Sequence, residues 1–164
     1  MAEGVAALRQ PTVLVVDDDA AMREFLKSVL ATEGFVVSEA ANGEDSIKQA
    51  LTLKPDLLLL DLRMPAPDGV AICKAIRGNE RTATIPILVV TGTMSREQIE
   101  ESMSAGADDF LSKPINVRDL IIRVRAMLES KQIADPVDRL QHYLKTVREM
   151  TDKLPPPAGP DGKP

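Results

Sequence analysis

The sequence lacks a second cysteine, a long apolar run and an excess of basic residues. A lone cysteine, Cys73, permits no disulfide within the chain and suits a reducing compartment. No apolar run approaches the ~18 residues of a membrane span, and the N-terminal MAEGVAALRQP has no signal-peptide hydrophobic region. The formal net charge is −5, whereas non-specific binding of nucleic acid needs a basic face. We therefore expect a cytoplasmic protein that neither enters a membrane nor binds nucleic acid directly.

Five short segments are expected to be strands, most of them apolar, and a segment with helical spacing of its apolar residues follows each of them. The expected strands cover residues 12–16, 35–38, 56–60, 85–90 and 108–111, and Asn42, Ser95 and Asn116 are expected to cap three of the helices. Runs that are apolar on both faces are typical of parallel strands covered by helices on two sides. Right-handed crossovers then predict a doubly wound, five-stranded parallel α/β sheet that binds its ligand beyond the carboxyl ends of the strands.

The composition divides the chain into four parts. Residues 1–10 are expected to form a flexible leader, and residues 11–130 contain the βα units. Residues 131–154 hold a hinge, KQIADP, and one further helix, for which Asp135 and Pro136 are good first residues. Residues 155–164, PPPAGPDGKP, are rich in proline and glycine, which predicts an extended or disordered tail.

The helix expected at 136–154 carries an apolar stripe. The stripe follows the alternating steps of three and four of a heptad seam at Val137, Leu140, Leu144, Val147 and Leu154. Two more apolar residues, Tyr143 and Met150, widen it. Such a stripe needs a cover, which could be the chain's own domain, a second copy or a target protein. Because fewer than three heptads make an isolated pair marginal, we favour a homodimer through this helix assisted by residues 95–129.

Polar side chains stand at the carboxyl ends of four expected strands. Asp17 and Asp18 follow the first, Asp61 the third, Thr91 ends the fourth and Lys113 follows the fifth. An Asp-Asp pair alone is typical of a helix cap or a turn, but here separate strands deliver five polar residues to one edge. Two carboxylates ~4 Å apart repel by about 4 kcal/mol at an effective dielectric constant near 20, which calls for a cation or a raised pKa. Clustered oxygens suit Mg²⁺, and with a lysine and a hydroxyl they make a site for a transferring phosphoryl group.

Four segments of the sequence, VLVVDDD, LLLLDLRMPAPDG, IPILVVTGT and GADDFLSKP, resemble the signature blocks of bacterial response-regulator receiver domains in their usual order. The resemblance covers roughly residues 11–130 and is to receivers like the chemotaxis regulator, which have a flavodoxin-like strand order. It implies that Asp61 is the phosphoacceptor, with a histidine kinase or phosphotransfer protein as donor. It further implies that Asp18 binds Mg²⁺ directly, that Asp17 acts mainly through water, and that the backbone carbonyl of Arg63 is a further ligand.

The resemblance also assigns roles around the phosphoryl group. Lys113 would pair with the phosphoryl oxygens, and Thr91 would bond to the group and move toward it. Phe110 matches the aromatic switch position, although an aromatic residue in that strand is often only a core residue. The Lys113–Pro114 bond is expected to be cis.

Other functions fit the residues less well. An aspartyl-phosphate hydrolase needs a second aspartate two residues after the first, where this chain has Arg63. A dinucleotide site needs G-x-G-x-x-G, which is absent, and a flavodoxin-like site needs a Ser/Thr/Gly-rich loop where this chain has DDDAA. We therefore predict a signalling protein of a two-component system rather than an enzyme. Two readings of its output stay open, a regulator that acts alone by protein contact and the receiver part of a longer regulator.

Overall fold

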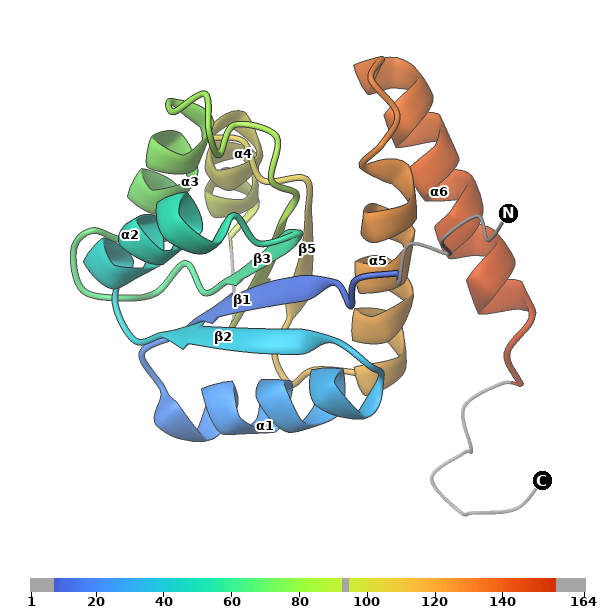
Figure 1. Ribbon diagram of the computed structural model, residues 1–164, viewed down its shortest axis with the longest axis horizontal. Helices are drawn as coiled ribbons and strands as arrows, with labels where there is room; N and C mark the ends of the chain where they lie inside the picture. Colours follow the sequence, from blue (N-terminus) through green and yellow to red (C-terminus); the bar gives the residue numbers. More distant parts are fainter. Residues whose placement is uncertain (1–7, 93–94, 156–164) are drawn as a thin grey trace, which may run out of the picture.

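The computed structural model describes residues 8–92 and 95–155. Within these ranges five strands alternate with helices, and a sixth helix follows (Figure 1). The elements in chain order are β1 Thr12–Val16, α1 Ala20–Thr32, β2 Val36–Ala40, α2 Gly43–Leu53, β3 Leu57–Leu60, α3 Gly69–Arg77, β4 Ile87–Thr91, α4 Arg96–Ser104, β5 Asp109–Ser112, α5 Val117–Ser130 and α6 Pro136–Asp152. All strand pairs are parallel, in the order β2-β1-β3-β4-β5, which confirms the predicted doubly wound sheet with flavodoxin-like order.

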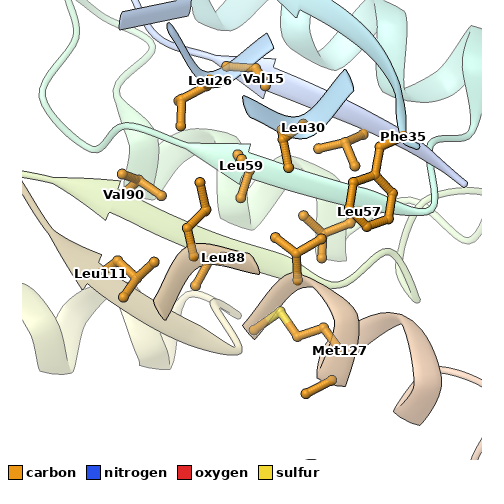
Figure 2. Packing of buried hydrophobic residues seen from close by; sticks show 14 of the residues in the cluster. Val15, Leu26, Leu30, Phe35, Leu57, Leu59, Leu88, Val90, Leu111 and Met127 are labelled. Carbon is orange, nitrogen blue, oxygen red and sulfur yellow. The ribbon is translucent and has the colours of Figure 1, made fainter. Parts of the chain in front are cut away.

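The sheet separates two apolar cores because successive strand residues point to opposite faces. Val15, Leu59 and Leu88 belong to the core under α1 and α5, and Figure 2 shows their side chains in one cluster with those of Leu30 and Met127. The intervening strand residues pack under α2 and α3 and include Leu14, Val16, Leu58, Leu60, Ile87 and Val89. All four leucines of β3 are buried, so β3 lies at the centre of both cores.

Side-chain caps define where the helices begin. Asn42 and Asn116 accept the expected bonds at α2 and α5, and Ser95 and Gln98 form the predicted capping box of α4. Asp135 caps α6, with Pro136 in its first turn. These capping signals were predicted correctly because each acts within a single turn of its helix.

Four of the five strands differ from the prediction by one or two residues at one end or both, and β3 begins at Leu57 rather than at Asp56. Phe35 bonds through its N–H to the carbonyl of Leu30 and stays outside β2, which continues to Ala40 opposite Val16. Ile85 bonds back to Thr82, so β4 begins at Ile87 and extends to Thr91. The last strand is shifted in the same sense, to Asp109–Ser112.

Helix α6 lies beside α5 and runs back along it (Figure 1). It ends at Asp152, so Leu154, which was expected to belong to the apolar stripe of this helix, lies outside it. The docking splits the stripe: Tyr143 is buried and Val147 packs on the core, whereas Val137, Leu140 and Leu144 are 62%, 53% and 56% exposed. The chain's own α5 thus covers one half of the stripe.

The leader and the tail predicted for residues 1–10 and 155–164 lie largely outside the described residues. Within the described part of the leader, Arg9 forms an ion pair with Asp56. Among the described residues, no helix combines the length and the apolar character needed to cross a bilayer.

Candidate functional site

The carboxyl edge of the sheet brings the predicted residues together. Asp17 and Asp61 directly follow β1 and β3, which are neighbouring strands, and Asp18 comes next after Asp17. One carboxylate oxygen from each of the three aspartates lies within 4.8 Å of the others. Asp17 and Asp61 are buried, whereas Asp18 is exposed. The cluster is therefore open to solvent on the side of Asp18.

Asp61 is held by donors from two directions. Its Oδ1 accepts a bond from the Thr91 hydroxyl at 3.0 Å and another from the Arg63 backbone N–H at 3.0 Å. Its Oδ2 lies 3.4 Å from the Lys113 ammonium. The side chain is only 7% exposed, so these contacts fix the carboxylate in a defined orientation.

Lys113 bridges the two buried aspartates. Its Nζ lies 2.7 Å from Asp17 Oδ2, closer than to Asp61. Burial would lower the pKa of Lys113, but the bond to Asp17 and the charge of Asp61 raise it, so the lysine stays protonated. Burial raises the pKa of Asp17 and outweighs the bond from Lys113, which lowers it.

One ammonium among three carboxylates leaves the site with an excess of negative charge. Carboxylate oxygens that converge in this way, with one side open to solvent, are the donors that a hard divalent cation prefers. The donor set therefore fits Mg²⁺, as the sequence predicted.

Phe110 is the predicted switch residue. It is half-buried in β5 and packs against the core under α2 and α3. Its place fits both a core residue and a switch residue, so the switching role stays a prediction. The Lys113–Pro114 bond is cis, as expected, and Ala66–Pro67 is a second cis bond that the sequence did not indicate.

Two supporting residues were missed. Arg23 of α1 donates to the Asp17 carbonyl at 2.8 Å, and helical spacing alone did not distinguish it from other surface arginines. Gly69 begins α3 against the loop after β3, where an added Cβ would lie 2.5 Å from Leu62 Cα and 2.8 Å from the Asp61 carbonyl oxygen. The Asp68–Gly69 pair after the proline-rich loop was the available signal for this close approach.

A doubly wound α/β domain with three aspartates and a lysine at the carboxyl edge of its sheet has the architecture of the receiver class of signalling domains. Residues 13–125 match the response regulator receiver domain family, and the chain belongs to that family.

Relatives and solved structures agree with this assignment. The chain is 38% identical over 118 residues to the DNA-binding dual master transcriptional regulator RpaA of Synechocystis, covering 72% of this chain and 49% of that protein. It is 40% identical over 116 residues to the transcriptional regulatory protein ResD of Bacillus subtilis, covering 71% and 47%. The chain thus matches about half the length of these curated relatives.

Among solved structures, the fold is similar to the chemotaxis protein CheY4 of Vibrio cholerae, with a TM-score of 0.68, 30% identity and coverage of 71% of this chain and 98% of that one. A CheY-like receiver domain protein from Methanospirillum hungatei gives a TM-score of 0.72, with 28% identity and coverage of 76% and 98%. The similarity to chemotaxis-type receivers is therefore shown in three dimensions.

Proposed function

We propose that the chain is a phosphorylation-dependent switch in which Asp61 accepts a phosphoryl group from a phosphohistidine of a histidine kinase or phosphotransfer protein. An Asp61 carboxylate oxygen attacks phosphorus, the phosphorus–nitrogen bond breaks, and the histidine nitrogen leaves with the bonding pair. The supporting observation is the Asp61 carboxylate, buried and oriented at a strand end, with Lys113 and Thr91 on its two oxygens.

The surrounding side chains divide the work of neutralising charge. Lys113 would bind the phosphoryl oxygens. The Thr91 hydroxyl, which donates to Asp61 in this structure, would donate to a phosphoryl oxygen instead. Asp17, Asp18, Asp61 and the Arg63 backbone carbonyl would hold Mg²⁺, which supplies positive charge against the incoming phosphoryl group. Because Lys113 and Thr91 are already held in place, they would stabilise the negative charge of the phosphoryl group with little rearrangement.

The output we propose is by protein contact, with a second copy as one partner and no direct binding of nucleic acid. Such contacts suit a signalling protein rather than an enzyme, and a cytoplasmic one. The DNA-binding function printed for RpaA belongs to a protein of which this chain matches 49%. The same receiver chemistry would serve a longer regulator, so the proposal for Asp61 does not depend on the output.

Phosphotransfer to the intact chain tests this function. The wild type should gain label from a phosphorylated histidine kinase or from acetyl phosphate in Mg²⁺, and Asp61→Asn should gain none. Asp68→Asn is a matched control, since Asp68 is an exposed carboxylate seven residues away that caps α3 through a bond that asparagine can also make. Label on Asp61→Asn equal to that on the wild type would disprove the assignment.

A further inference from the structure

The carboxylate of Asp109 joins three elements of the fold. Asp109 is the first residue of β5, and its Oδ1 accepts a bond from the N–H of Phe110 at 2.8 Å. Its Oδ2 accepts from the guanidinium of Arg123 on α5 and from the hydroxyl of Tyr143 on α6. Arg123 also donates to the Tyr143 hydroxyl at 3.4 Å. A single side chain at the edge of the sheet thus connects β5, α5 and α6.

Tyr143 is the buried anchor of α6. It is 7% exposed and its ring belongs to the core under α1 and α5. Polar contacts join α6 to both ends of α5: Arg118 donates to the Thr151 carbonyl at 3.1 Å, and Ser130 Oγ lies 3.1 Å from Nδ1 of His142 in the middle of α6. Helix α6 is therefore docked along α5 from end to end (Figure 1).

The other end of β5 reaches the phosphorylation site. Lys113 follows β5 directly and its N–H donates to the Thr91 carbonyl at 2.7 Å. Strand β5 is the edge of the sheet, so it pairs with β4 alone. Only three residues thus separate Lys113, whose ammonium faces Asp61, from Asp109, whose carboxylate binds Tyr143. Because hydrogen bonds weaken steeply with distance and angle, a carboxylate with donors from three elements tolerates little displacement of its strand.

We propose that α6 is a releasable cover of the α5–β5 surface, and that phosphorylation of Asp61 loosens it by breaking the Tyr143–Asp109 contact. This inference rests on the proposed function of Asp61. The phosphoryl group draws Lys113 and Thr91 toward itself, β5 shifts with Lys113, and the bonds to Asp109 lose their geometry. Release exposes the buried half of the α6 stripe, including Val147, together with the α5 surface beneath it.

Reciprocity makes the coupling measurable from both sides. If the phosphorylated state favours undocked α6, then the undocked form binds a phosphoryl analogue more tightly than the docked form by the same factor, and weakening the docking must strengthen the observed binding by up to that factor. Removing the Tyr143 hydroxyl removes the bond to Asp109 and keeps the ring that fills the core. Its effect therefore separates the coupling from a general loss of packing.

Tyr143 also reports on its own release. It is the only tyrosine of a chain without tryptophan, so emission on excitation near the tyrosine maximum comes from this residue alone. The fluorescence of a tyrosine is quenched when its hydroxyl donates a hydrogen bond to a carboxylate. Adding beryllofluoride with Mg²⁺ to the intact chain should raise the emission and speed hydrogen exchange in α6. Unchanged emission and exchange, at beryllofluoride saturation measured by calorimetry, would overturn the proposal.

A second test measures the affinity of variants for beryllofluoride by calorimetry. Tyr143→Phe should bind beryllofluoride about fivefold or more tightly than the wild type, within the usual range of coupling between sites. Gln141→Ala is the matched control, because Gln141 is an exposed residue of α6 two positions before Tyr143 and lies outside the apolar stripe, and its affinity should equal that of the wild type. Equal affinity for Tyr143→Phe and the wild type would sink the inference alone. Failure of the wild type to bind beryllofluoride would overturn the proposed function and this inference with it.

Discussion

Two buried aspartates flank the leucine strand β3, and their surroundings are opposite. Asp56, just before β3, bonds to Lys131 and Arg9 and accepts the Thr12 N–H at 2.8 Å. Asp61, just after it, shares its single ammonium with Asp17. Two cations outweigh the one carboxylate at the amino edge of the sheet, whereas negative charge is in excess at the carboxyl edge. The first arrangement serves stability, and the second prepares the site for a cation and a phosphoryl group.

The Asp56 carboxylate should make stability depend on pH. Burial would raise its pKa, but the bonds from Lys131 and Thr12 lower the pKa from 3.8 to about 2. A lowered folded-state pKa gives stability that is fully present above pH 3.8 and is lost as the pH falls toward 2. Asp56→Asn should therefore cost about 2 kcal/mol near pH 7 and nearly nothing near pH 2, as measured by urea unfolding.

A surface carboxylate is the control for Asp56. Glu44 pairs with Lys48 at 3.1 Å with both side chains largely exposed, so Glu44→Gln should change the unfolding free energy by less than about 0.5 kcal/mol at either pH. A cost for Asp56→Asn that does not shrink on acidification would show that its role is not ionic.

Binding of Mg²⁺ should stabilise the fold. The ion relieves repulsion among Asp17, Asp18 and Asp61, and an ion at 100 times its dissociation constant adds about 2.7 kcal/mol. The melting temperature should rise with Mg²⁺ in the wild type and stay constant in Asp18→Ala. Asp19→Asn keeps a capping side chain on α1 and should respond like the wild type. An equal Mg²⁺ response in Asp18→Ala would place the ion elsewhere.

At the residue scale, the main site was predictable and its supports were not. Asp17, Asp61, Thr91 and Lys113 could be found because parallel strands bring their carboxyl ends to one edge whatever the loops do. The hydrogen-bond partners of Asp109 could not be predicted, because they depend on how α6 packs. One of them, Tyr143, lies 34 residues further along the chain. Local patterns carry no information on such contacts.

The central strand sets the stability of the whole sheet. Leu59 of β3 is 1% exposed and lies among side chains of α1, α5 and two neighbouring strands (Figure 2). Leu59→Ala should cost about 2–5 kcal/mol, since a packed core cannot close the cavity fully. Urea unfolding measures this cost, and Leu144→Ala on the exposed side of α6 should cost less than about 1 kcal/mol. A loss below 1 kcal/mol for Leu59→Ala would mean that the core repacks.

Helices were easier to delimit than strands. Caps such as Asn116 act within one turn, so the start of α5 was predicted to the residue. The ends of β2 and β4 depend on pairing with β1 and β3, which no local signal encodes. The stripe of α6 was correctly found, but its width pointed to several covers, and only the packed structure shows that α5 takes one half.

The other half of that stripe bears on assembly of the whole molecule. Val137, Leu140 and Leu144 remain exposed on the outer side of docked α6. Leu140 also lines a groove of about 390 Å³ between α6 and the loops before β4 and β5, with Met103 of α4 on its wall. A stable interface buries about 1,200 Å² or more in total, beyond what three side chains supply. The proposed homodimer therefore needs the α4 side of the 95–129 surface as well as α6.

Light scattering on the intact chain tests this dimer. The wild type should approach twice the monomer mass as concentration rises, and beryllofluoride should lower the concentration required, because release of α6 adds apolar surface to the interface. Leu140→Glu with Leu144→Glu should stay monomeric, since each charge would be buried unpaired. Gln132→Glu adds a charge in the exposed turn before α6 and should dimerise like the wild type. A monomer mass for the wild type at every concentration, with and without beryllofluoride, would assign the exposed stripe to a different protein.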